Sequence, residues 1–178
     1  FLIHFAFSEC SDLSQADCDY WPTYCSWNSE QNICEEIGGG GGGSYEFGSY
    51  EVATYTQNDG LQPGSLYADA TIYHPIGYND LLGSIILGAG FGGDQESMEN
   101  WAYYFSSYGF VSATIQYNDP VNDSHGFRAE AILELISSIK MEEDRPNSPL
   151  FNALDTSEFA AVGYSLSGGS VQLAAVLN

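Results

Sequence analysis

Basic side chains are nearly missing from this chain of 178 residues. Only Arg128, Lys140 and Arg145 oppose 24 acidic residues, so the formal net charge is −21 at pH 7. A protein of this charge is repelled by phosphate backbones and by anionic membrane surfaces. The composition therefore argues against nucleic acid as a partner. The acidic residues are spread along the chain without a long block, which is typical of a solvated surface.

Long apolar segments are missing as well. The apolar stretch at residues 1–8 is too short to span a bilayer. It ends in Ala6-Phe7-Ser8, which has the small-x-small form of a signal peptidase site, and no initiator Met precedes it. We interpret residues 1–8 as the remnant of a secretory signal and expect a secreted, extracellular protein. The alternative is an ordinary buried strand.

Cysteine is confined to one short segment, at Cys10, Cys18, Cys25 and Cys34. An even number in a secretory context predicts two disulfides, in any of three pairings, within a small module over residues 9–36. A metal site is disfavoured because no C-x-x-C pair occurs and His4 is the only nearby imidazole. We therefore expect neither a metal nor a cofactor.

Aromatic residues are interleaved with these cysteines, at Tyr20, Trp21, Tyr24 and Trp27. They are open to two interpretations. They could form a stacking surface for a polymer or a cell-surface ligand, or they could fill the core of the module. The second is favoured because small modules need bulky side chains and cross-links to be stable.

A change of sequence character follows the cysteines. The unbroken glycine run from Gly38 to Gly43 cannot pack a core and behaves as flexible coil. We interpret residues 37–47 as a linker and residues 48–178 as the main domain.

Strand-like and helix-like segments alternate within this domain. Strands are predicted at residues 50–56, 66–73, 81–87, 110–116 and 159–162, and helices at residues 96–108 and 127–141. Asn58-Asp59-Gly60 marks a turn between the first two strands. This order predicts an α/β domain with a mostly parallel sheet flanked by helices.

One serine follows the last predicted strand in a turn of small residues. Residues 163–167 read Gly-Tyr-Ser-Leu-Ser, which fits a nucleophile elbow, G-x-S-x-G, except that Ser167 replaces the second glycine. An elbow holds its serine, here Ser165, in a strained conformation between a strand and a helix. The positions two before and two after, Gly163 and Ser167, must be small so that strand and helix can cross closely. The alternative is a plain glycine-rich strand-to-helix turn.

A second loop of small residues follows the predicted strand at 81–87. Its sequence from Gly88 to Gly93 is G-A-G-F-G-G. A phosphate cradle is the alternative to a catalytic loop, but the Lys-Ser/Thr of a P-loop is missing and the match to a dinucleotide fingerprint is loose. The acidity of the chain argues further against bound phosphate.

Several motifs together resemble one family. From about Gly48 onward the chain is similar to the α/β-hydrolase branch that contains cutinase-like polyester hydrolases, lipases and dienelactone-hydrolase-like esterases. The matching segments are Thr71-Ile72-Tyr73-His74-Pro75, Gly90-Phe91, Tyr108-Gly109-Phe110-Val111, Leu154-Asp155-Thr156-Ser157 and Gly163-Tyr164-Ser165-Leu166.

The resemblance implies a serine hydrolase that cleaves carboxylic esters of small molecules, lipids or polymers such as cutin. It implies that Ser165 is the nucleophile and that the backbone N–H groups of Phe91 and Leu166 form the oxyanion hole. Two such donors, aimed at the oxygen that becomes negative, stabilise the transition state.

The sequence departs from the family in one respect. Members of this fold place the acid and the histidine of the triad after the serine, but residues 166–178 contain no Asp, Glu or His. The three histidines, His4, His74 and His125, all precede Ser165. We therefore expect residues 48–178 to be a C-terminally incomplete hydrolase domain, with an exposed apolar edge and no activity by itself. The alternative is a non-catalytic member of the fold that acts by binding.

Overall fold

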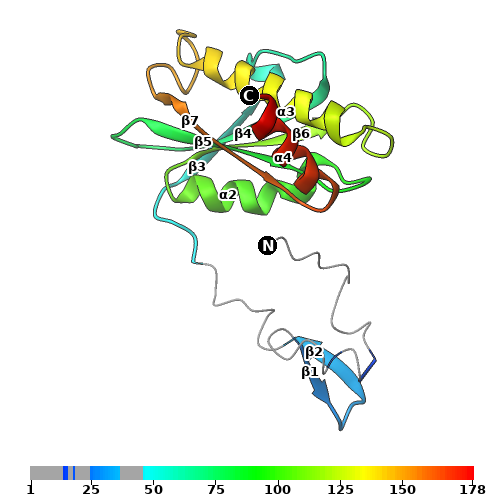
Figure 1. Cartoon of the computed structure of the whole chain (residues 1–178). Helices are drawn as coiled ribbons and strands as arrows, with labels where there is room; N and C mark the ends of the chain where they lie inside the picture. The colour runs from blue at the N-terminus through cyan, green and yellow to red at the C-terminus, as the bar shows by residue number, and fades with distance from the viewer. Residues whose placement is uncertain (1–13, 16–17, 19–24, 37–45) are drawn as a thin grey trace. The chain divides into compact units, whose positions relative to one another are not determined.

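The computed structural model describes Ser14, Gln15, Cys18, residues 25–36 and residues 46–178 (Figure 1). The chain divides into two units, and the boundary between them in the sequence lies between Glu46 and Phe47. The predicted signal remnant at residues 1–8 and the glycine run at residues 38–43 lie outside the described residues. Within the described ranges, no helix combines the length and the apolar character that a membrane crossing needs.

The N-terminal unit contains a hairpin of two short antiparallel strands, β1 (Cys25–Asn28) and β2 (Ile33–Glu36). The side chain of Asn28 accepts hydrogen bonds from the backbone N–H groups of Glu30 and Gln31. An Asn side chain used in this way mimics a backbone turn. The hairpin is therefore closed by local polar contacts.

A disulfide joins Cys18 to Cys34, and both residues are buried. This confirms a disulfide in the cysteine-rich segment and selects one partner for Cys34, which the spacing alone left open. Cys10 and the side chain of Cys25 lie outside the described residues. So do three of the aromatic residues in this segment, Tyr20, Trp21 and Tyr24.

The second unit is built on a five-stranded sheet with the order β3-β4-β6-β5-β7. The strands are β3 (Val52–Thr56), β4 (Tyr67–Pro75), β5 (Leu82–Gly88), β6 (Val111–Tyr117) and β7 (Leu154–Gly163). β4 pairs antiparallel with β3 and β6, whereas β5 pairs parallel with β6 and β7. It follows that β4 alone runs against the other four strands.

The sheet is thus mixed, and the prediction of a mostly parallel sheet missed the reversed strand. The connections on either side of β4, residues 57–66 and 76–81, contain no α-helix. A parallel connection needs a crossover of a dozen or more residues, so these short connections reverse the chain direction. The first of them holds the turn expected at residues 58–60, as a 3-10 helix, η2 (Gln57–Asp59), followed by Gly60 with φ 104°.

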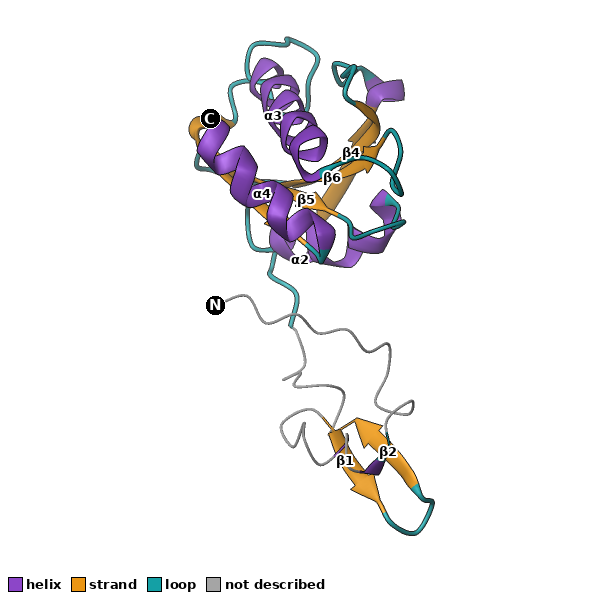
Figure 2. Ribbon diagram, turned by 45° about the vertical axis from the view of Figure 1, so that its right-hand side comes forward, coloured by secondary structure: helices purple, strands orange, loops and turns teal. Residues whose placement is uncertain are grey.

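Helices cover both faces of the sheet (Figures 1 and 2). They are α2 (Glu99–Ser107), which continues a 3-10 turn, η3 (Gln95–Met98), and α3 (His125–Glu142) and α4 (Leu166–Leu177). α2 lies on one face, and α3 and α4 lie side by side on the other. The two helices predicted before the elbow are present, each within two to three residues of the expected ends.

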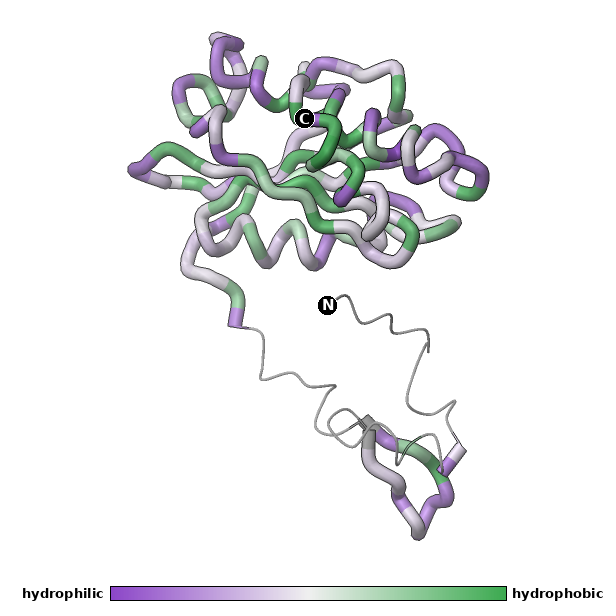
Figure 3. The backbone as a smooth tube through the Cα atoms, in the orientation of Figure 1, coloured by the Kyte–Doolittle hydropathy of each residue, from purple (hydrophilic) through white to green (hydrophobic). Residues whose placement is uncertain are grey.

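Alternate residues of the central strands point to opposite faces and build a core on each. On β5, Ile86 packs in the core beneath α3 and α4, while Ile85 and Leu87 pack against α2. Figure 3 shows the resulting concentration of apolar residues along the central strands. The central strands are therefore buried on both faces of the sheet.

The edge of the sheet at β7 is exposed within the described part of the chain. β7 pairs with β5 on one side only. Val162 on β7 and Leu173 and Val176 on α4 are exposed, Val176 by 81%. This is the exposed apolar edge that the sequence predicts.

Candidate active site

Ser165 lies at the sharp junction between the end of β7 and the start of α4. Its backbone has φ 49° and ψ −114°, a combination that a residue with a Cβ seldom adopts. Strain of this kind persists only where the surrounding structure enforces it. The side chain is exposed, does not cap the helix, and makes no hydrogen bond to any described residue. The hydroxyl is therefore presented to solvent.

Close packing of β7 against α4 enforces this conformation. A Cβ built on Gly163 would lie 2.1 Å from the carbonyl oxygen of Ser167, so only glycine fits there. Ser167 itself is fully buried, and its hydroxyl donates to the carbonyl of Ala89 at 2.5 Å. The serine that replaces the second glycine of the elbow pattern is thus accommodated by a specific hydrogen bond.

The loop after β5 runs beside Ser165. A Cβ built on Gly90 would lie 3.2 Å from the Cβ of Ser165, so the backbone of this loop approaches the serine closely. The next residue, Phe91, is 67% exposed. Within residues 46–178, neither the Phe91 N–H nor the Leu166 N–H donates to an acceptor. The structure therefore brings Ser165 together with the two residues whose N–H groups the family resemblance selects.

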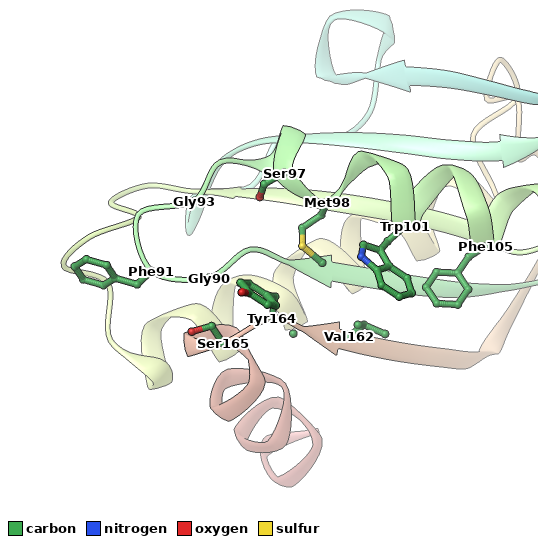
Figure 4. A pocket seen from close by; sticks show the side chains of 11 residues that line it. Gly90, Phe91, Gly93, Ser97, Met98, Trp101, Phe105, Val162, Tyr164 and Ser165 are labelled. Atoms are coloured by element: carbon green, nitrogen blue, oxygen red, sulfur yellow. The ribbon is translucent and has the colours of Figure 1, made fainter. Parts of the chain in front are cut away.

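An apolar groove extends from Ser165 along the sheet (Figure 4). It has a volume of about 490 Å³. Phe91 and Ser165 lie at one end and Trp101 and Phe105 of α2 at the other, with Tyr164 between them. The remaining lining residues are Gly90, Gly93, Ser97, Met98, Val162 and Gly163. Such a groove accepts apolar or aromatic groups.

A buried polar network supports the elbow from below. Arg128, at the start of α3, is fully buried and donates to the hydroxyl of Ser167 at 3.2 Å. The Tyr117 hydroxyl lies 2.9 Å from the same atom, and because the Ser167 proton is directed to Ala89, Tyr117 is the donor. Burial raises the pKa of Tyr117, which keeps this proton in place.

The sequence analysis missed Arg128 as a part of this network. The signal was present in the helical pattern, because Arg128 shares one face of α3 with the buried Ile132, Leu135 and Ile139 at helical spacing. A charged residue at an apolar position of a helix indicates a buried polar contact.

His74 lies at the opposite end of the sheet from Ser165 and so cannot act as its catalytic base. Its neighbour Tyr73 pairs with Ser112 near the start of β6, whereas Ser165 follows the end of β7. The ring of His74 packs edge-on against Tyr55, and burial lowers the pKa of the imidazole. His74 is therefore a core residue.

His125, at the start of α3, packs against the first turn of α4 and does not hydrogen-bond Ser165. A Cβ built on Gly169, one turn into α4, would lie 2.6 Å from its ring. No His, Asp or Glu in the described part of the chain hydrogen-bonds Ser165, and His4 lies outside it. Nor do the described residues bring three potential metal ligands together. The triad acid and base are thus not found among the described residues.

The chain matches the model of a known protein family. The model of the PETase family, described as PET hydrolase-like, matches residues 45–178. The chain belongs to this family, which carries the α/β-hydrolase fold. No curated protein matches the sequence.

Proposed function

We propose, from the membership of the PET hydrolase-like family, that this chain carries the nucleophile and the oxyanion hole of a serine hydrolase that cleaves carboxylic esters. Ser165 is the nucleophile, and the N–H groups of Phe91 and Leu166 are the oxyanion donors. The observation that carries the proposal is the strained, exposed Ser165 beside two backbone N–H groups without acceptors among the described residues. A fold does not fix an activity, but this arrangement is what ester hydrolysis needs.

The proposed reaction has two steps. The Ser165 hydroxyl passes its proton to the base of the triad as its oxygen attacks the ester carbonyl, which forms a tetrahedral intermediate with a negatively charged oxygen. This oxygen accepts from the Phe91 and Leu166 N–H groups, and the loss of one such donor lowers the rate by about 100-fold or more. The ester C–O bond then breaks, and the alcohol leaves with the proton that the base returns to it. Water gives a proton to the same base as it attacks the acyl-enzyme, and that proton returns to the Ser165 oxygen as the acid is released.

The groove beside Ser165 suggests the substrate class. Its walls are aromatic and aliphatic side chains, chiefly Trp101, Phe105 and Met98, and they offer few polar partners. An ester whose acyl part is apolar or aromatic, as in a polyester segment, would bury its surface there.

We propose that the acid and the base of the triad come from residues beyond position 178. This rests on two observations: residues 166–178 contain no Asp, Glu or His, and the side chain of Ser165 makes no hydrogen bond within the described ranges. The family order, with both partners after the serine, agrees. The chain by itself would then be inactive.

The protein is proposed to act outside the cell. The buried Cys18–Cys34 disulfide supports this, because disulfides persist in oxidising compartments. The hairpin unit that carries the disulfide is proposed to serve either as a small stable module or as a contact surface for a polymer.

The second candidate function is binding without catalysis. It is favoured by the same absence of a base next to Ser165 in the described part of the chain. In that case the groove would hold a ligand that is not cleaved.

Hydrolysis of a short-chain aromatic ester by the purified full-length protein separates the two functions. Ser165→Ala is expected to lower kcat by more than about 10³-fold and to leave the melting temperature unchanged. Ser157→Ala is the matched control, because Ser157 is an exposed serine on β7, the strand that precedes Ser165, and its side chain bonds only to Asp155. Equal activity of the two variants would refute the nucleophile assignment, and a folded wild-type protein without activity would support binding.

A further inference from the structure

Arg128 is a buried cation without a carboxylate partner in the described part of the chain. Its guanidinium donates to the carbonyls of Ala89 at 3.1 Å, Gly90 at 3.3 Å and Pro120 at 2.6 Å. A buried charge is usually paired, because its removal from water costs several kcal/mol. This chain has 24 acidic residues, so carboxylates are not scarce. The unpaired guanidinium therefore indicates a role in holding these carbonyls.

The contact with Gly90 fixes the direction of a proposed oxyanion donor. The Gly90 carbonyl and the Phe91 N–H belong to one peptide group, and the described residues contain no cis peptide bond. In a trans peptide the C=O and the N–H point in opposite directions. The Gly90 carbonyl accepts from Arg128 and also from the Gly93 N–H at 3.3 Å, so this peptide directs the Phe91 N–H away from the buried guanidinium.

A second contact holds the loop on the far side of Phe91. The Pro120 carbonyl accepts from Arg128 and also from the Gly92 N–H, at 2.8 Å. Arg128 thereby links the peptide before Phe91 to the segment that anchors the residue after it. The residues before and after Phe91 in the chain are therefore both fixed.

The same guanidinium reaches the elbow. It donates to the hydroxyl of Ser167, two residues after Ser165, and lies 4.2 Å from the ring centre of Tyr117. A glycine in place of Ser167 would have no hydroxyl to accept this bond. The departure from the elbow pattern thus connects the nucleophile helix to the loop that carries Phe91.

We propose that Arg128 is a positioning residue for ester hydrolysis. It orients the Gly90–Phe91 peptide so that the Phe91 N–H meets the oxyanion, and its charge polarises that peptide in the same sense. The inference rests on the proposed function, because it assumes that Phe91 donates to an oxyanion. Arg128 does not touch the substrate.

The test is the steady-state hydrolysis of an aromatic ester by the full-length protein with Arg128→Met and Arg128→Lys. Loss of the carbonyl contacts misplaces the donor, so kcat is expected to fall by about 100-fold in Arg128→Met with KM unchanged. Lysine keeps the charge without the fork of donors, so Arg128→Lys should recover part of kcat. All assays are run below the melting temperature of each variant.

Arg145→Met is the matched control, because Arg145 contacts the buried Glu142 at the other end of α3. It should lower stability and leave kcat unchanged. If Arg128→Met does not fold, Ser167→Ala removes one acceptor of the same guanidinium and should lower kcat without a change in KM.

The results separate the two proposals. An unchanged kcat in folded Arg128→Met, or an equal fall in Arg128→Met and Arg145→Met, overturns the positioning role alone. A wild-type protein that hydrolyses no ester overturns the proposed function and the positioning role together.

Discussion

Each end of α3 carries a buried charged side chain, and the two side chains have different kinds of partner. At the C-terminal end, Glu142 forms an ion pair with Arg145 and accepts from the hydroxyls of Tyr55 and Ser148. At the N-terminal end, Arg128 donates hydrogen bonds only to carbonyl and hydroxyl oxygens among the described residues, and its guanidinium lies over the ring of Tyr117.

This difference separates a buried charge that stabilises the fold, at Glu142, from one that we propose positions an oxyanion donor, at Arg128. Burial and the nearby Glu142 carboxylate raise the pKa of Tyr55, so its hydroxyl stays a donor and the far end of α3 forms a closed set of partners. The contacts of Arg128 are instead directed at the loop beside Ser165. We therefore expect changes at the far end to affect stability and changes at the near end to affect catalysis.

The largest expected effect on stability is at the far end. Arg145→Met would leave the Glu142 carboxylate buried without its cation, so the free energy of unfolding is expected to fall by about 3 kcal/mol. Chemical denaturation monitored by circular dichroism measures this. A loss below about 0.5 kcal/mol would show that the ion pair between Arg145 and Glu142 does not stabilise the C-terminal end of α3.

A smaller effect of opposite sign is expected at the elbow. Ser165→Gly relieves the positive φ of this residue, so the free energy of unfolding should rise by about 1 kcal/mol while activity is lost. Ser165→Ala is the control, because alanine removes the hydroxyl and keeps the strain. Equal stabilities of the two variants would mean that the elbow stores no strain.

The smallest effect is expected in the middle of α3, at the partly exposed Glu134. Burial opposes ionisation of its carboxyl, but hydrogen bonds from the Ser65 and Leu66 N–H groups outweigh it and hold the pKa of Glu134 below its ordinary 4.5. A lowered pKa means that the stabilisation is complete above pH 4.5 and is lost as the pH falls below it.

Glu134→Gln should therefore flatten the fall in melting temperature between pH 5 and pH 3. Glu130→Gln, an exposed residue one turn earlier on the same helix, is the control. Identical pH profiles for wild type and Glu134→Gln would show that the ionised Glu134 carboxylate does not stabilise the fold.

Much of this fold could be predicted because most elements carry a clear pattern. The strand ending at Gly88 has an apolar run at Ile85–Leu87, and the helix at 127–141 has a buried face with helical spacing. The first half of β7 was missed because Asp155, Thr156 and Glu158 lie on an exposed edge, where burial selects no apolar residues.

Some properties depend on contacts between distant segments and could not be predicted. The partner of Cys34, for example, depends on which cysteines meet. The reversal of β4, in contrast, could have been predicted from its two short connections, which leave no room for a parallel crossover. The elbow could be found because its small residues are adjacent in sequence. Arg128 could not be assigned, because the loop that it holds is about 40 residues away from it in the chain.

The most direct test of Ser165 as an activated nucleophile is the reaction of the full-length protein with a fluorophosphonate, followed by peptide mapping. The probe bonds only to a serine that is activated and stabilised at an oxyanion hole. Labelling at Ser165, at a rate that falls in Arg128→Met and not in Arg145→Met, is the predicted result. A folded protein that carries no label at Ser165 would contradict it.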